Sequence, residues 1–116
     1  MLRSDARLRR SADIQAVRNA KNSWRGSLVI LAAHKNDLPT SRFAFICSRR
    51  IGKAVVRNRV RRLLRESVRT RFDLIEPGWD CLLIARPAIQ KASFFDVQTA
   101  VFALLRQANL LVGELS

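Results

Sequence analysis

The residues from about Val55 to Phe72 repeat with a helical period, and this segment restricts the possible folds more than any other. At about 100° per residue, one side of the helix must be buried, since it collects Val56, Val60, Leu63, Leu64, Ser67 and Val68. The opposite side, an arc of about 100°, collects Asn58, Arg61, Arg62, Arg65 and Arg69. The segment therefore predicts a helix with a core face and a strongly basic face.

Apolar runs predict three strands, at 27–33, 42–48 and 79–85. The last two stand directly before and after the basic helix, so the three elements form a β-α-β unit, for which a right-handed crossover is the default. Alternation within 42–48 separates Phe43, Phe45 and Cys47 on one face from Ala44, Ile46 and Ser48 on the other.

Two further amphipathic patterns predict helices near the ends of the chain. The first runs from Ser11, its expected N-cap, to Lys21, and a break at 22–26 follows it. The second begins after Ser93, with Asp96 at the capping-box position, and its apolar stripe is Phe94, Val97, Val101, Leu104 and Leu105. The order α-β-β-α-β-α predicts helices packed on one small sheet, and 116 residues form a single domain, 1–116.

The charge of the chain is concentrated around the central helix. Lys and Arg total 22 against 9 Asp and Glu, a net charge of +13, yet 48% hydrophobic content excludes a disordered basic tail. Arg57, Arg61, Arg65 and Arg69 are successive i,i+4 neighbours of one sign, and each such pair costs an isolated helix about 0.2–0.5 kcal/mol. On a face that served only solubility, Glu residues would alternate with the arginines. This ladder of four arginines therefore predicts binding to nucleic acid.

Other classes of protein fit the composition poorly. The chain has one histidine, no tyrosine and scattered carboxylates, so no catalytic or metal-binding constellation is visible; Cys47, Cys81 and His34 are more simply two core thiols and a loop histidine. No apolar run approaches the roughly 20 residues that span a bilayer, and no signal peptide is visible. We expect reduced thiols in a cytoplasmic protein. Helix-turn-helix and zinc-finger spacings are missing, and charge alone leaves DNA and structured RNA open.

The segment from Ser48 to Glu66, SRRIGKAVVRNRVRRLLRE, closely resembles the signature of the bacterial ribonuclease P protein component. The stretches 7–15 and 83–87 resemble other parts of that family in the same order. The resemblance implies an α+β fold, a small two-layer α/β sandwich (ribosomal protein S5 domain 2-like) whose one mixed sheet has a left-handed β-α-β crossover. It also implies a non-catalytic protein subunit, which helps a catalytic RNA with Mg²⁺ to remove the 5′ leader of precursor tRNA.

The resemblance also implies which residues bind RNA. Its motif and basic loop fall on Arg49, Arg50, Lys53, Arg57, Asn58, Arg59, Arg61, Arg62, Arg65 and Arg69. Gly52 would let the backbone approach RNA. Candidates for a cleft that holds the leader are Arg10, Ile14, Arg18, Leu31 and Ser48, and three of these, Ile14, Arg18 and Leu31, replace aromatic residues common in the family.

The implied partners are the catalytic RNA and the 5′ leader of precursor tRNA, with no membrane and no protein partner required. No cofactor is expected on the protein itself, and Mg²⁺ is expected at the RNA active site. Two other classes share the basic charge: a stand-alone ribosomal, structured-RNA-binding or DNA-binding module without a processing role, and a protein-only nuclease. Neither explains the whole signature, and a nuclease would need catalytic residues that the sequence does not display.

Overall fold

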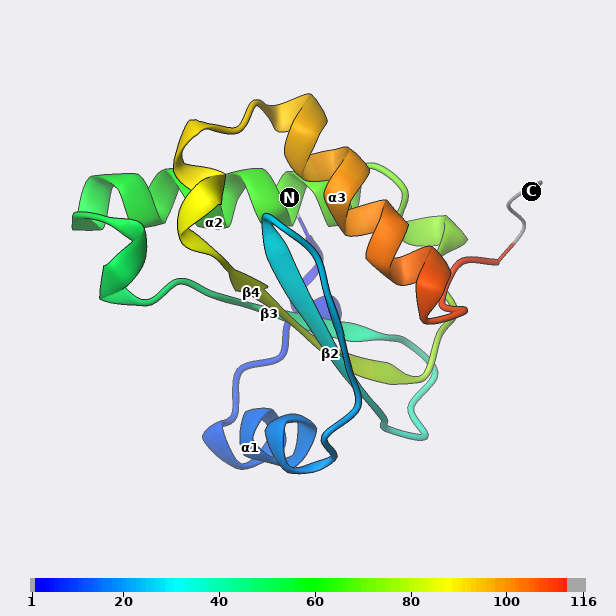
Figure 1. Cartoon of the computed structure of the whole chain (residues 1–116). Coiled ribbons are helices and arrows are strands. Elements are labelled where there is room, and N and C mark those ends of the chain that lie inside the picture. Colours follow the sequence, from blue (N-terminus) through cyan, green and yellow to red (C-terminus); the bar gives the residue numbers. More distant parts are fainter. Residues whose placement is uncertain (1, 113–116) are drawn as a thin grey trace.

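The computed structural model describes residues 2–112, which form three α-helices and one four-stranded sheet (Figure 1). The main elements are α1 (Ser11–Asn19), β1 (Ser23–Arg25), β2 (Val29–Lys35), β3 (Arg42–Ile46), α2 (Ala54–Arg69), β4 (Trp79–Ala85) and α3 (Phe94–Gln107). Short 3₁₀ turns lie between them: η1 (Ser4–Ala6), η2 (Arg49–Ile51), η3 (Phe72–Leu74) and η4 (Pro87–Lys91).

The sheet is mixed, and its strand order is β1-β2-β4-β3. The pairs β1/β2 and β2/β4 are antiparallel, whereas β3 and β4 are parallel and joined through α2. In Figure 1, β3 is the rear strand, α2 lies above the sheet, and β4 runs in front of β3 in the same direction, which makes the crossover left-handed. The right-handed default is therefore wrong, and the family resemblance implied the correct hand.

The two faces of the sheet are covered differently (Figure 1). Helices α2 and α3 lie on one face and enclose the larger core, in which Leu31, Phe43, Leu64, Leu83 and Leu105 are fully buried. Helix α1 lies on the other face, over a smaller cluster that includes Val17 and Leu82. The alternation expected in β3 is confirmed, because Phe43 and Cys47 join the first cluster and Ala44 joins the second.

The structure corrects several local expectations. The break at 22–26 contains β1, a strand too short to show any periodicity; it forms because its backbone pairs with β2. The N-cap of α1 is Arg10, which makes no side-chain capping bond, and Ser11 is the first helical residue. In α3 the capping box of Ser93 and Asp96 is confirmed, but Phe94 is exposed and Phe102 takes its place in the core.

Candidate nucleic-acid interface

Helix α2 presents the basic face that its sequence predicts. Its core side is confirmed by Val60, Leu64 and Val68, all fully buried against the sheet and α3. On the other side, Arg62 and Arg69 are exposed, and Arg57, Arg61 and Arg65 are half-buried along one flank. Internal partners are few: Asn58 accepts a hydrogen bond from Arg61 at 2.9 Å, and Glu66 accepts one from Arg69 at 3.0 Å. Most of the ladder is therefore not neutralised by the helix itself.

A basic turn stands immediately before α2. Ile51 anchors η2 in the core, which leaves Arg49 and Arg50 exposed, and Lys53 is the exposed N-cap residue of α2. The first turn of α2 has no acidic residue and no side-chain cap, so no negative side chain of that turn stands beside its free N–H groups and the positive end of the helix dipole. An anion is the partner that this end of the helix lacks.

Gly52 and Arg59 act within the protein. Gly52 has φ +146°, and a Cβ there would lie 3.0 Å from Gln90 Nε2 and 3.1 Å from Val56, so glycine is required by the chain's own packing. Arg59 donates from Nη2 to the carbonyl oxygen of Gln90 at 2.6 Å, and Gln90 Nε2 donates to the carbonyl oxygen of Ile51. Arg59 thus fastens α2 to η4 and η2, a role that its place in the motif did not predict.

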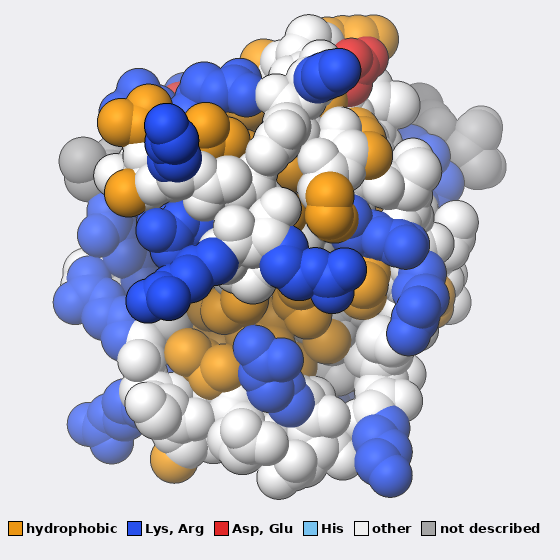
Figure 2. Space-filling view, turned by 60° about the vertical axis from the view of Figure 1, so that its left-hand side comes forward, with side chains coloured by type: hydrophobic (Ala, Val, Ile, Leu, Met, Phe, Trp, Pro, Cys, Tyr) orange, Lys and Arg blue, Asp and Glu red, His pale blue; other side chains and the backbone are white. Residues whose placement is uncertain are grey.

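A hollow of about 280 Å³ lies beside the basic helix, at the outer edge of β3. The residues preceding α1 run along this edge, where Leu8 N donates to the Phe43 carbonyl oxygen at 2.9 Å. Around the hollow stand Arg7, Leu8, Arg9, Ile14, Phe43, Ala44, Phe45, Ile46 and Arg65. On this side of the molecule, Figure 2 shows an apolar floor ringed by Lys and Arg side chains.

The hollow combines predicted residues with missed ones. Ile14 and Arg65 were expected near RNA, whereas Arg7 and Arg9 on the rim were not. The signal for these two is visible in retrospect: arginines at alternate positions flank Leu8, which is buried, as in a strand with one face exposed. A basic rim over an apolar floor suits a nucleotide chain, whose phosphates and bases need different surroundings.

The expected cleft residues do not form one site. Arg18 lines a second hollow of about 240 Å³, with Lys21 and Arg25 above Ile30 and Ile84. Arg10 and Ser48 are exposed but line neither hollow.

The placement of Leu31 in the cleft is wrong. Its side chain is 0% exposed and lies in the core under α2 and α3. Its neighbour Ile30 faces the second hollow instead. The run 27–33 is apolar at nearly every position, so its sequence does not reveal which side chains face which way, and a shift of one residue exchanges the two faces.

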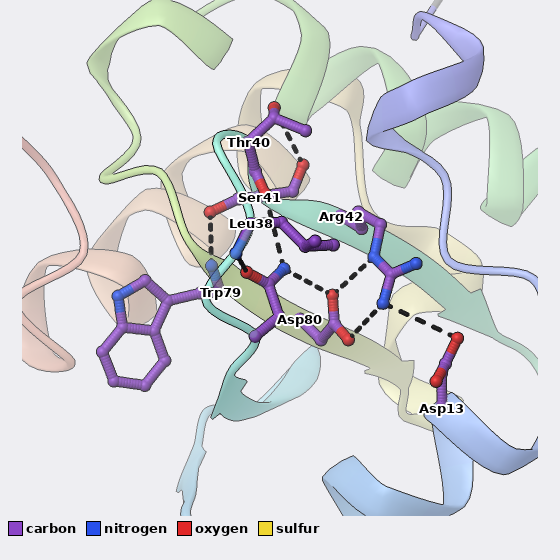
Figure 3. A network of polar contacts seen from close by, with 8 residues as sticks. Asp13, Leu38, Thr40, Ser41, Arg42, Trp79 and Asp80 are labelled. Carbon is purple, nitrogen blue, oxygen red and sulfur yellow. Dashed lines mark hydrogen bonds and ion pairs between the residues drawn. The ribbon is translucent and has the colours of Figure 1, made fainter.

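A network of ion pairs centred on Arg42 joins β3 to β4 and reaches α1 (Figure 3). Arg42 on β3 makes two hydrogen bonds to Asp80 on β4, at 2.8 and 2.7 Å, and its Nη2 lies 3.6 Å from Asp13 of α1. Asn36 donates a further bond to Asp80 at 2.8 Å. Hydrogen bonding to Asp80 raises the pKa of Arg42 above its ordinary value. Arg42 therefore belongs to the framework of the protein and not to its basic surface.

The two cysteines and the histidine, the candidates for catalysis by the protein itself, lie in different environments. Cys47 and Cys81 are buried and unpaired, and His34 is exposed on β2. Burial raises the pKa of both thiols, an effect that Arg61 and Arg57 oppose at Cys47. Within residues 2–112, no three His, Cys, Asp or Glu side chains gather into a possible metal site. No helix in the same range is long and apolar enough to cross a bilayer.

Comparison with known proteins gives a consistent result over nearly the whole chain. The family model described as Ribonuclease P matches residues 2–109. The ribonuclease P protein component of Roseiflexus castenholzii is 41% identical over 95% of this chain and 91% of its own length. That of Alkaliphilus oremlandii is 33% identical over 90% and 92%.

Solved structures agree in fold. The RNase P protein from Thermotoga maritima superposes with a TM-score of 0.80 at 27% identity, covering 87% of this chain and 96% of that one. The RNase P protein of Staphylococcus aureus, at 22% identity, has a TM-score of 0.84 and covers 91% and 97%. With the ribonuclease P signature lying on the basic turn and the arginine face of α2, the chain belongs to the ribonuclease P protein family, whose members take part in maturing the 5′ end of tRNA.

Proposed function

We propose that this chain is the subunit of ribonuclease P that holds the catalytic RNA on its basic turn and α2, and the 5′ leader of precursor tRNA beside them. The observation that carries the proposal is the adjacency of two surfaces: the arginine face of α2 and an apolar-floored hollow to which Arg65 also belongs. Structured RNA meets the first surface and the single-stranded leader meets the second. With this function, we expect the protein in the cytoplasm.

The two surfaces recognise RNA through different chemistry. Arg61, Arg62 and Arg65 can make bidentate, charge-assisted hydrogen bonds to phosphates, and each phosphate bound releases condensed counterions. The first turn of α2 adds N–H groups that no side chain of the protein caps. In the hollow, Arg7 and Arg9 can hold the leader phosphates while Ile14 and Ile46 contact its bases.

In this proposal the protein performs no bond-breaking step. When bound, Mg²⁺ would supply charge stabilisation at the cleaved phosphodiester, and we assign it to the RNA. The protein neutralises phosphates that would otherwise need divalent ions, and positions the leader relative to the catalytic RNA.

The test is cleavage of precursor tRNA by the protein alone, by the catalytic RNA alone and by both, across a Mg²⁺ titration. We expect no cleavage by the protein alone and a lower Mg²⁺ requirement for the mixture than for the RNA. Metal-dependent cleavage by protein that is free of contaminating nuclease would contradict the assignment of bond breaking to the RNA. Tight RNA binding without any effect on cleavage would favour an RNA-binding protein without a processing role.

The leader surface has its own test, which uses precursors with leaders of increasing length and mature tRNA as the control. Arg9→Ala should weaken binding of the long-leader precursor and leave mature tRNA almost unaffected. Lys35→Ala is a matched control, because Lys35 is an exposed cation on β2 that lines neither hollow. Affinity independent of leader length would show that the hollow does not hold the leader.

A further inference from the structure

The first turn of α3 exposes an aromatic ring that the proposed function does not use. Phe95 is 71% exposed, whereas its neighbour Phe94 is 38% exposed, and Phe95 is the most exposed aromatic side chain among residues 2–112. The hollows beside α1 contain no comparably exposed ring, since Phe43 is buried and Phe45 is half-buried. The surface best suited to stacking a base therefore lies on α3, away from the expected leader cleft.

Phe95 borders a hollow of about 200 Å³ between α3 and the end of α2. Cations and amide or hydroxyl groups share this hollow with the ring; its lining includes Arg71, Gln98, Thr99, Phe102 and Arg106. The Arg71 guanidinium lies 5.0 Å from the centre of the Phe102 ring, which holds it in place without neutralising it. Gln98 is oriented by a 3.0 Å hydrogen bond from its Nε2 to Thr70 Oγ1.

This set of groups matches the parts of a single nucleotide. An exposed ring offers a face for a base, guanidinium groups bind phosphate, and an amide and a hydroxyl can bond a base edge or a ribose. The position of the hollow also fits RNA. Arg71 lies two residues beyond the end of α2. Thr70, which bonds Gln98, is the C-cap of this helix, and Arg65 on the other flank of the helix lines the first hollow.

The charge of the hollow argues against a second copy of the chain as its occupant. A symmetric dimer through this face would bring two copies of Arg71 and Arg106 together, between molecules that each carry a net charge of +13. A polyanion meets no such repulsion and gains from the same arginines.

We propose that Phe95, Arg71 and the surrounding hollow on α3 form a second RNA site, which binds an unpaired nucleotide by stacking its base on Phe95. The inference rests on the proposed function, because it takes the occupant to be an RNA that α2 also contacts. It adds a surface on the flank of α2 opposite the hollow at the β3 edge. An unpaired stretch of the catalytic RNA and an unpaired stretch of the substrate share this chemistry.

The direct test is tryptophan fluorescence, because a stacked base quenches an indole. Phe95→Trp should be quenched by a short oligouridylate to a greater extent than the wild type, whose Trp24 and Trp79 give the background. Phe94→Trp is the matched control, one residue away and outside the hollow, and it should behave as the wild type. Equal quenching of the two variants would overturn the proposal.

Affinity separates the stacking contact from the charge contact. Phe95→Ala should weaken oligouridylate binding by at least about fivefold, and Phe95→Trp should restore it, with an unchanged dependence on salt. Arg71→Ala should lower the salt slope by about 0.7, the value for one phosphate contact on a single strand. Phe94→Ala controls for general effects on α3, and thermal melting confirms that each variant is folded. An unchanged affinity in Phe95→Ala would overturn the proposal.

Two further experiments show which RNA supplies the nucleotide and which results would contradict the inference. Holoenzyme assembly with the catalytic RNA and binding of precursor tRNA are each measured with Phe95→Ala, and the step that weakens names the RNA concerned. If Phe95→Ala instead changes only the sedimentation coefficient of the protein, the ring binds another copy of the chain and the inference is wrong. If wild-type protein assists cleavage but Phe95→Ala matches it throughout, this inference fails and the proposed function stands.

Discussion

Helices α2 and α3 pack on the same face of the sheet, yet their N-terminal ends are opposite in character. In α3, Ser93 Oγ accepts a hydrogen bond from Asp96 N at 3.1 Å, and Asp96 accepts one from Ser93 N at 3.2 Å. The acidic side chain also matches the positive end of the helix dipole. In α2, Lys53 occupies the N-cap position, and the first turn has neither a cap nor an acidic residue.

The exposed faces differ in the same sense. That of α2 carries a series of arginines with only Glu66 among them, whereas α3 carries one acidic and one basic residue, Asp96 and Arg106. The interactions at the start of α3 are completed within the protein. Those of α2 are left for an anionic partner, so a helix that lowers its own stability in the free protein points to the binding surface.

The largest effect on stability should come from the buried faces of α2 and α3, which are alike in the two helices. Leu64 of α2 and Leu105 of α3 are both fully buried in the same core. Leu64→Ala and Leu105→Ala should each lower the free energy of unfolding by about 2–5 kcal/mol, measured by urea denaturation. A small loss in only one of them would mean that the two helices do not share the core equally.

The next effect should separate the two N-terminal ends. Ser93→Ala removes a cap that makes reciprocal hydrogen bonds and should lower the free energy of unfolding by about 0.5–2 kcal/mol. Lys53→Ala removes no capping bond and should stay within about 0.5 kcal/mol of the wild type. Equal losses in the two variants, measured by urea denaturation, would remove the contrast between capped and uncapped ends.

Adding an N-cap to α2 should make its N-terminal end resemble that of α3. The variant should be more stable and should bind RNA more weakly. Lys53→Asp places an acceptor and a negative charge at the free N–H groups, and should raise the free energy of unfolding by up to about 1 kcal/mol. RNA affinity should fall, because a carboxylate now occupies the place of an RNA phosphate. Filter binding with the catalytic RNA checks this, and unchanged affinity would show that the N-terminus of α2 does not meet RNA.

The smallest effect on stability should come from the arginine face. Arg65→Ala should leave the free energy of unfolding nearly unchanged, because its half-buried side chain lines the first hollow and lies outside the core cluster that contains Leu64. Its RNA affinity should fall, with a salt slope lower by about 0.7–0.9, the value for one phosphate contact. Lys35→Ala is the control and should leave the slope intact. An Arg65→Ala protein that unfolds would place Arg65 in the framework of the protein.

The sequence by itself determined the elements whose pattern is local. The helical period predicted from about Val55 to Phe72 defined both faces of α2, although the helix itself spans Ala54–Arg69, and Trp79–Ala85 formed the strand that its apolar run predicts. The capping box of α3 was readable because its two residues, Ser93 and Asp96, are three positions apart. Such features depend on neighbours within one or two turns, and the chain displays them directly.

The tertiary structure alone decided which distant segments meet. It placed β4 between β2 and β3, set the left-handed crossover, turned Leu31 into the core and engaged Arg59 with Gln90. It also brought Arg7 and Arg9 beside Arg65, residues more than fifty positions apart in the chain. Periodicity describes one element at a time, whereas these contacts follow from how strands pair and helices pack, which no local pattern encodes.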